Sequence, residues 1–395
     1  MKKTLIAVAV AGAFAAPSAM AAELSTNVYW STAITMGETT TTAADGTSTG
    51  VDRGEVQDAG GNRLMFTWTD TLDNGVGVNA YLSFGNLGTA NLGGVNVRNA
   101  NIGFSGDFGK VQVGTNEHFS ETDLLFDPSF GDFGNTGDAI SYIQLGQSGF
   151  NFTRRDGESV WFTSNDMNGV QLRAVYIFGS QNQTATADPE GTQIGLSYTS
   201  GPLRVGINQA TYSDYSANGG GTDISDTAIL LNGAASAAVQ GSEAQMTTLL
   251  ASYDLGVVNI KAARWSIDQS GIAITNSTQV ADAGTTTALE ATGRSIFIGM
   301  PVGGGTLWAQ SSSLSDQDAT VAGVTTAIAN SGKTGWDVGY HHAMNAQVNF
   351  FVRYGVSESE IEFNNDTSTA TGAVVDGAET ATEISELMIG WQLMY

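Results

Sequence analysis

Basic side chains recur in this sequence within segments that alternate between apolar and polar residues. Arg63, Arg173, Arg204, Lys261 and Arg353 all fall on the polar side of such segments, because successive residues of a strand point to opposite faces. Basic groups around a narrow polar passage sort solutes by charge without making or breaking a bond. We therefore expect these side chains to line the inside of a closed sheet. The alternative is that each pairs with a nearby acid and has no effect on solutes, since exposed ion pairs are individually weak.

Catalytic arrangements are not visible in the sequence. The chain has no cysteine, and no Ser–His–acid motif is apparent, although a triad is assembled in space rather than along the chain. The histidines His118, His341 and His342 lack the additional, regularly spaced ligands of a metal site. We therefore expect neither an enzyme nor a metal centre.

One acidic cluster leaves a cofactor question open. Glu358, Glu360, Glu362 and Asp366 lie close together in a polar stretch, where carboxylates normally form a solvated loop face. Several carboxylate oxygens in one loop are also what Ca²⁺ requires. We expect no cofactor, with a loop-bound Ca²⁺ as the alternative.

The strands that position these side chains are clearest at the C-terminal end. Between Glu383 and Tyr395, one face carries Leu387, Ile389, Trp391, Leu393 and Tyr395, and the other carries polar or small residues. A soluble sheet gives the same alternation, but an exposed edge of this kind invites aggregation. In a barrel the last strand pairs with the first and the edge disappears.

Similar segments occur in pairs along the chain and predict an all-β fold of about sixteen strands. Short turns such as Asp73-Asn74-Gly75 and Gly303-Gly304-Gly305 join the two members of each pair. The pairs are separated by long polar loops at 37–62, 86–97, 115–157, 179–191, 213–244, 267–293, 314–334 and 356–382. Short turns at one end and long loops at the other are typical of an antiparallel transmembrane β-barrel, with periplasmic turns and extracellular loops.

The N-terminal residues and the composition agree with export to a bacterial cell envelope. Residues 1–21 combine Lys2 and Lys3, a short apolar stretch and an Ala19-Met20-Ala21 cleavage site, which predicts a signal peptide. Residues 22–395 are then expected to form one barrel domain. The net charge of −24 argues against a nucleic-acid partner, because phosphate contacts need Lys and Arg.

A local motif adds a family resemblance. The stretch RNANIGFSGDFGKVQVGTN from Arg98, the strand at Arg63 and the aromatic C-terminal strand resemble the general porins of Gram-negative bacteria. That family forms trimeric sixteen-stranded outer-membrane barrels whose third loop folds into the lumen, and a terminal aromatic strand resembles the signal read by the barrel-assembly machinery. The resemblance implies a homotrimer surrounded by outer-membrane lipid and lipopolysaccharide.

The resemblance also implies candidate residues for the narrowest part of the pore. Asp127-Pro128-Ser129-Phe130-Gly131-Asp132 in the third long loop is similar to the loop tip of enterobacterial porins, although Ser129 stands where the family has a glutamate. Asp127 and Asp132 would then face a basic wall. Arg63, Arg98, Arg154 and Arg155 are the candidates for that wall.

Arg98 is the candidate on which two arguments disagree. Simple alternation groups it with Ala100, Ile102 and Phe104, which form the predicted lipid face, whereas the resemblance places it in the lumen. Either a β-bulge intervenes, or Arg98 lies above the membrane at the rim of a loop.

The function expected from these observations is passive diffusion of ions and small hydrophilic solutes through an outer-membrane pore. A cation preference is expected, because acidic residues concentrated at a pore mouth attract counter-ions. Those assigned to the long loops are Glu38, Asp45, Asp52, Glu55, Asp58, Asp188, Asp214, Asp223, Asp226, Asp282, Asp316, Asp318, Glu358, Glu360 and Glu362. The alternatives are a substrate-selective channel, an outer-membrane barrel enzyme, and a plugged structural or adhesive barrel.

Overall fold

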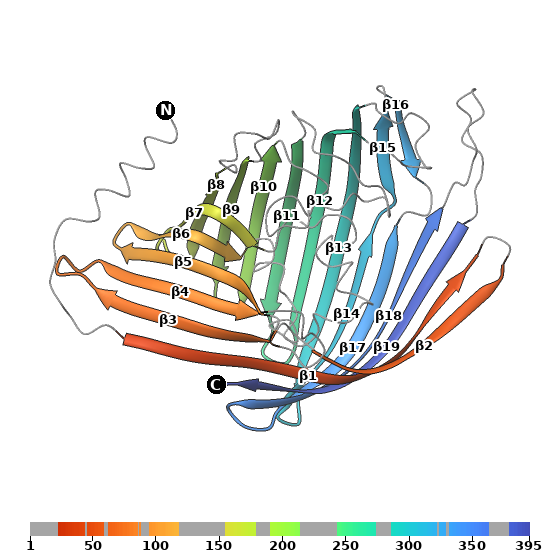
Figure 1. Ribbon diagram of the computed structural model, residues 1–395, viewed down its shortest axis with the longest axis horizontal. Helices are drawn as coiled ribbons and strands as arrows, with labels where there is room; N and C mark the ends of the chain where they lie inside the picture. The colour runs from red at the N-terminus through yellow and green to blue at the C-terminus, as the bar shows by residue number, and fades with distance from the viewer. Residues whose placement is uncertain are drawn as a thin grey trace.

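The computed structural model describes residues 23–43, 46–58, 62–85, 87, 95–117, 155–178, 190–213, 243–273, 286–321, 324–328, 332–362 and 379–395. The predicted signal peptide lies outside this part of the chain. The described residues form strands and connecting turns (Figure 1). None of them forms a helix with the length and apolar character needed to cross a membrane.

The strands follow one another along the chain with antiparallel neighbours. Their bounds are β1 Glu23–Thr42, β2 Ser48–Asp58, β3 Arg63–Thr71, β4 Gly77–Gly85, β5 Asn96–Gly106, β6 Gly109–Glu117, β7 Arg155–Thr163, β8 Val170–Ile177, β9 Glu190–Ser200, β10 Leu203–Ser213, β11 Glu243–Asp254, β12 Asn259–Ala273, β13 Thr286–Val302, β14 Gly305–Leu314, β15 Gln317–Val321, β16 Val324–Ile328, β17 Lys333–Ala343, β18 Val348–Glu362 and β19 Glu379–Met394.

Pairing of the first and last strands closes the sheet into a barrel. Tyr29 to Thr42 of β1 lie opposite Met394 to Ala381 of β19, and the amide of Tyr395 donates to the carbonyl oxygen of Val28 at 3.0 Å. The C-terminal end therefore lies beside β1 (Figure 1). The prediction that the last strand pairs with the first is confirmed.

The expected number of about sixteen strands is also confirmed. β1 pairs with β3 along its first residues and with β2 along the rest, so β2 and β3 occupy one position in the wall. In the same way β13 pairs with β14 and then β15, while β14 pairs with β17 and β15 with β16. Three positions in the wall are thus each split into two segments, which leaves sixteen.

The strands are longer than the apolar alternation predicted, and several predicted loops, including 267–293 and 356–382, are partly sheet. The stretch 37–62 is built mainly from the end of β1 and all of β2, and β15 and β16 form a hairpin within 314–334. The acids that therefore lie in strands rather than loops are Glu38, Asp52, Glu55, Asp58, Asp318, Glu358, Glu360 and Glu362. The prediction was wrong here because these extensions lack an apolar face, whereas backbone pairing requires none.

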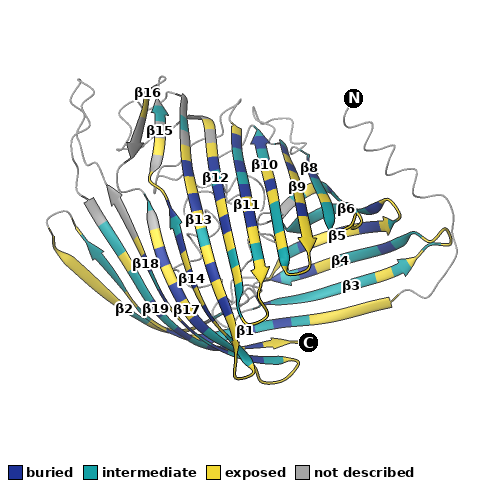
Figure 2. Ribbon diagram, turned by 180° about the vertical axis from the view of Figure 1, so that it is seen from behind, coloured by how far each residue is buried: buried dark blue, intermediate teal, exposed yellow. Residues whose placement is uncertain are grey.

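Side-chain alternation sorts each strand into an inner and an outer face. Along β19, Glu386, Met388 and Gln392 are buried, whereas Trp391 and Leu393 are exposed, as the sequence predicted. Figure 2 shows the same alternation of buried and exposed residues along β9 to β14. The exposed face is rich in Ile, Leu, Val and aromatic residues, which suits a barrel wall in contact with lipid.

Candidate functional site

The inner face carries most of the described basic side chains. The structure places Arg173, Arg204, Lys261 and Arg353 on this face. Arg173 lies against the inner side of Gly195, Arg204 shares its face of β10 with buried Asn208 and Ala210, and the Lys261 ammonium lies 5.0 Å from the centre of the Phe297 ring. Their effect on passing solutes stays a prediction.

A β-bulge turns Arg98 inward. Ser83 lies opposite Asn99 but Phe84 lies opposite Val97, so the register shifts at Arg98. The aliphatic part of the Arg98 side chain lies over the position where Gly85 would carry a Cβ, and Gly85 is buried on the inner face with Ser83. A bulge changes the direction of a side chain at the extra residue. The first of the two alternatives for Arg98 therefore holds.

Arg63 forms the centre of a second group on the inner wall. Its guanidinium lies 5.1 Å from the centre of the Tyr29 ring, a distance at which cation–π attraction operates. Its Nη1 atom lies 4.0 Å from Oε1 of Glu117. A cavity of about 450 Å³ borders Arg63, with Tyr29, Met65 and Tyr81 among its lining residues.

The wall candidates Arg63 and Arg155 both adjoin Glu117. Glu117 is the last residue of β6 and lies opposite Arg155, the first residue of β7. Arg154, Asp127 and Asp132 lie outside the described residues, as does most of the third loop, so the predicted acidic side of the constriction stays a prediction.

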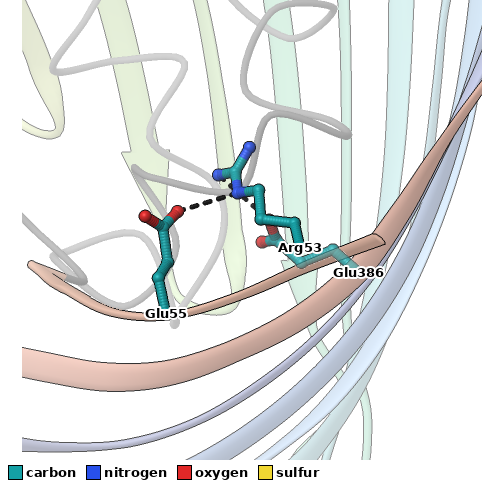
Figure 3. Close-up of polar contacts among 3 residues, drawn as sticks. All are labelled: Arg53, Glu55 and Glu386. Carbon is teal, nitrogen blue, oxygen red and sulfur yellow. Dashed lines mark hydrogen bonds and ion pairs between the residues drawn. The ribbon is translucent and has the colours of Figure 1, made fainter. Parts of the chain in front are cut away.

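The sequence did not indicate Arg53, which contributes a further inner-wall charge. Arg53 lies opposite Gly37 on β1, and Gly37 lies opposite Glu386 on β19. Without a side chain at Gly37, Arg53 extends across β1, and its Nη2 atom lies 3.7 Å from Oε2 of buried Glu386 (Figure 3). Its Nε atom donates to Oε1 of Glu55 at 2.8 Å. Sequence reasoning missed Arg53 because its segment was assigned to a loop.

Arg353 forms an ion pair with Asp337 on the adjacent strand. The Nε atom of Arg353 lies 2.8 Å from Oδ2 of Asp337, and the two side chains are only 6% and 1% exposed. Burial of two charges is tolerated only when they neutralise each other closely. The positive charge of Arg353 on the inner wall is therefore balanced by the negative charge of Asp337.

Aromatic rings lie against glycines along the inner wall. Trp265 faces Gly293, Trp308 faces Gly339 and Phe351 faces Gly390, each directly across from its partner. A Cβ on Gly339 or Gly390 would lie 2.5 Å from the facing ring.

The same arrangement recurs at Tyr212 and Gly191, where a Cβ would lie 2.7 Å from the ring. A flat ring beside a glycine restores the packing that the missing side chain would supply. It also keeps these large side chains close to the wall.

Metal binding finds no support among the described side chains. No group of three or more described His, Asp or Glu residues is arranged to hold a metal ion. His341 and His342 lie next to the short turn after β17, and His118 lies outside the described residues. The side chains of Glu360, Glu362 and Asp366 are also outside them, so the alternative of a loop-bound Ca²⁺ stays a prediction.

Solved structures with the same architecture cover nearly the whole chain. An OmpT of Vibrio cholerae that lacks loop L8 matches with a TM-score of 0.61 at 16% identity, covering 95% of this chain and all of that one. An anion-selective porin from Comamonas acidovorans matches at 0.62 and 18%, with 95% and 100% coverage. OmpF of Salmonella typhi in complex with daunomycin matches at 0.54 and 14%, with 94% and 97% coverage.

At these identities the similarity establishes the fold alone. No curated protein sequence matches the chain. The family profile of Gram-negative porins matches residues 7–362, which is most of the chain and includes all but one of the strands. Together with the closed barrel, this match shows that the chain belongs to the Gram-negative porin family and is a barrel of the bacterial outer membrane.

Proposed function

We propose that the chain forms a water-filled pore for passive diffusion of ions and small hydrophilic solutes. The observation that carries this proposal is a closed barrel of sixteen wall positions with charged and polar side chains on its inner face. A barrel of this size leaves an aqueous channel. Purified protein inserted into a planar lipid bilayer should produce discrete conductance steps in KCl. Correctly folded protein that gives no steps would exclude an open pore and favour a plugged structural barrel.

The barrel enzyme is the alternative from a different class. It predicts that substitution of a Ser, His or Asp at the rim abolishes hydrolysis of lipid or peptide substrates while conductance is unchanged. We propose a channel without catalytic activity. Assays of the purified protein with chromogenic esters and peptides should give rates equal to those of the buffer.

A substrate-selective channel would need exposed recognition surfaces along the lumen. An aromatic track for sugars requires ring faces that a solute reaches, yet Trp265, Phe297 and Trp308 are only 0%, 1% and 3% exposed. This burial favours general diffusion. Conductance in KCl that is unchanged by added maltodextrins or other sugars would agree with a non-selective pore.

We further propose a preference for cations. The support is the excess of acidic residues, 39 against 15 basic ones. The inner wall also carries positive charges, which would attract anions. However, Arg53, Arg63 and Arg353 each have a carboxylate within 4.0 Å, which weakens their attraction for anions. The acids towards the long-loop end are then left to attract counter-ions.

The zero-current potential across a KCl gradient measures this preference. It should indicate K⁺ selectivity in dilute salt and decline towards molar salt, because the Debye length shrinks from about 10 Å at 0.1 M to about 3 Å at 1 M. Chloride selectivity in dilute salt would instead assign control to the arginines of the wall.

We propose that the pore is a homotrimer and that β19 is the strand recognised during assembly into the membrane. One similar structure is described as the trimer form of the Vibrio cholerae OmpT. Near its end β19 carries outward-facing Trp391 and Leu393, and the exposed Tyr395 follows directly. Unheated protein should migrate on a gel as a slow band of three chains. Deletion of Tyr395 should lower the yield of folded barrel.

A further inference from the structure

The described basic side chains divide unevenly between the two faces of the wall. Those on the inner face are Arg53, Arg63, Arg98, Lys110, Arg173, Arg204, Lys261 and Arg353. Arg264 and Arg294 alone among the described basic side chains lie on the outer face, and both are exposed. Arg264 alternates with buried Ala263 and Trp265, and Arg294 alternates with buried Gly293.

The register brings these two arginines together. Arg264 of β12 lies directly opposite Arg294 of β13, which places their Cα atoms about 4.5–5.5 Å apart. Like charges in this position destabilise a sheet. Within the described part of the chain, neither guanidinium has a carboxylate within 4.0 Å, and the Nε atom of Arg294 donates to Oγ of Ser313 at 3.0 Å. No described carboxylate therefore neutralises the positive charges of Arg264 and Arg294.

The pair lies where the apolar part of the outer wall ends. On the short-turn side, Ile296 and Ile298 are exposed by 54% and 47%, and Leu249, which lies directly opposite Arg264 on β11, is exposed by 48%. On the long-loop side come Ser266 and Thr292, which lie opposite each other.

Beyond the hydroxyl residues, the outer wall becomes acidic. Asp268 lies opposite Glu290, and Glu290 lies opposite Asp318. This row is four residues, about 13 Å of strand, from the arginines. An anion on this part of the wall is consequently attracted at the arginines and repelled by the carboxylates beyond them.

We propose that Arg264 and Arg294 bind the phosphate group of a lipid in the outer leaflet. Guanidinium groups donate paired hydrogen bonds to phosphate oxygens, so one phosphate between the two side chains offsets their repulsion. The acyl chains of the same lipid would pack on Ile296, Ile298 and Leu249. Ser266 and Thr292 would face its polar headgroup. The occupant is therefore a phosphate-bearing lipid anchored in the membrane, rather than a free anion.

The test measures lipid binding by the detergent-solubilised trimer with native mass spectrometry. The probe is diphosphoryl lipid A, compared with the same lipid after removal of both phosphates. The wild-type protein should retain the phosphorylated lipid, and R264Q/R294Q should weaken binding by about tenfold or more, the usual effect of losing charge-assisted hydrogen bonds. The matched control R173Q/R204Q removes two arginines from the inner face and should bind like the wild type.

Three outcomes would overturn the proposal. These are equal retention of the two lipids by the wild type, equal binding by R264Q/R294Q and R173Q/R204Q, and displacement of the lipid by millimolar inorganic phosphate alone. If the double variant fails to fold, R264Q and R294Q are measured separately. Each single variant should then bind the phosphorylated lipid more weakly than the wild type does. If neither single variant changed the affinity, the proposal would also be overturned.

Discussion

Trp265 lies directly across from Gly293 on the inner wall, with its ring over the place where a Cβ of residue 293 would be. The ring is completely buried, so a side chain at 293 displaces it away from the wall. We expect Gly293→Ala to destabilise the barrel by about 1–3 kcal/mol, the usual cost of overpacking. It should also lower single-channel conductance, because the ring moves toward the lumen.

The measurements are the midpoint of the heat-induced change in gel mobility and the conductance in KCl. Gly54→Ala is the matched control, since a Cβ at Gly54 meets open space. In a Trp265→Ala background, where no ring occupies this place, Gly293→Ala should lower the midpoint much less than it does in the wild type. A single Gly293→Ala variant that matches the wild type in both measurements would contradict this account of the pair.

The buried pair of Arg353 and Asp337 should be sensitive to loss of one charge. Asp337→Asn leaves the Arg353 guanidinium buried without its counter-charge, which typically costs about 3–5 kcal/mol. Replacement of both, as Asp337→Leu with Arg353→Met, should cost less than Asp337→Asn alone. Thermal unfolding followed by circular dichroism gives these differences. The control is Asp52→Asn, at an exposed position, which should leave the unfolding temperature unchanged. If Asp337→Asn and Asp52→Asn lowered the unfolding temperature equally, the Arg353–Asp337 ion pair would not be important for stability.

Arg53 and Glu386 should shift ion selectivity in opposite directions. A unit charge about 10 Å from a permeating ion contributes about 0.4 kcal/mol in water, so its removal changes a permeability ratio about twofold. Arg53→Gln should raise the K⁺/Cl⁻ ratio and Glu386→Gln should lower it, as measured from zero-current potentials. Glu358→Gln removes the same charge on the outer face and provides the control. Shifts of the same sign in both variants would exclude their placement beside the ion path.

The third loop provides a test of the constriction. If the segment from Asp127 to Asp132 narrows the lumen, deletion of Leu124 to Gly134 should raise single-channel conductance, because pore resistance is concentrated at the narrowest point. The deleted variant must first show the sheet spectrum of the wild type. Unchanged conductance in such a folded variant would place the loop outside the ion path.

Closure of the sheet predicts resistance to detergent. With the backbone groups of β1 and β19 paired, local opening of the wall is costly. The protein should therefore keep its β-sheet circular dichroism in SDS until it is boiled, and its gel mobility should change on heating. Equal mobility before and after boiling, with no slower trimer band, would be incompatible with a stable closed barrel.

The faces of the strands could be predicted from the sequence because lipid contact imposes a period of two. Trp391 and Leu393 alternate with Met388 and Gln392 in the sequence, and the structure places the two sets on opposite faces. Strand ends could not be predicted in this way. Glu55 and Glu358 belong to strand extensions where both faces are polar, so nothing in their pattern distinguishes strand from loop.

The positions of some site residues likewise could not be predicted from the sequence. Arg98 could not be oriented by counting, because a single extra residue in β5 reverses every side chain beyond it. Arg53 acquires its position from the register of β2 on β1 and of β1 on β19, a strand at the far end of the chain. The partnership of aromatic rings with glycines is likewise a matter of cross-strand register, since Trp265 and Gly293 are on different strands.

The pairing of Val28 with Tyr395 also determines when the barrel becomes complete. Val28 lies in β1 and Tyr395 directly follows β19, so the contact that closes the wall joins residues that are very far apart in the sequence. Contacts of this kind form late and slowly. Until β19 has paired with β1, both strands present open edges that pair readily with other chains. A chain truncated within β19 would therefore leave the edge of β1 unpaired and form an aggregation-prone sheet rather than a slightly smaller pore.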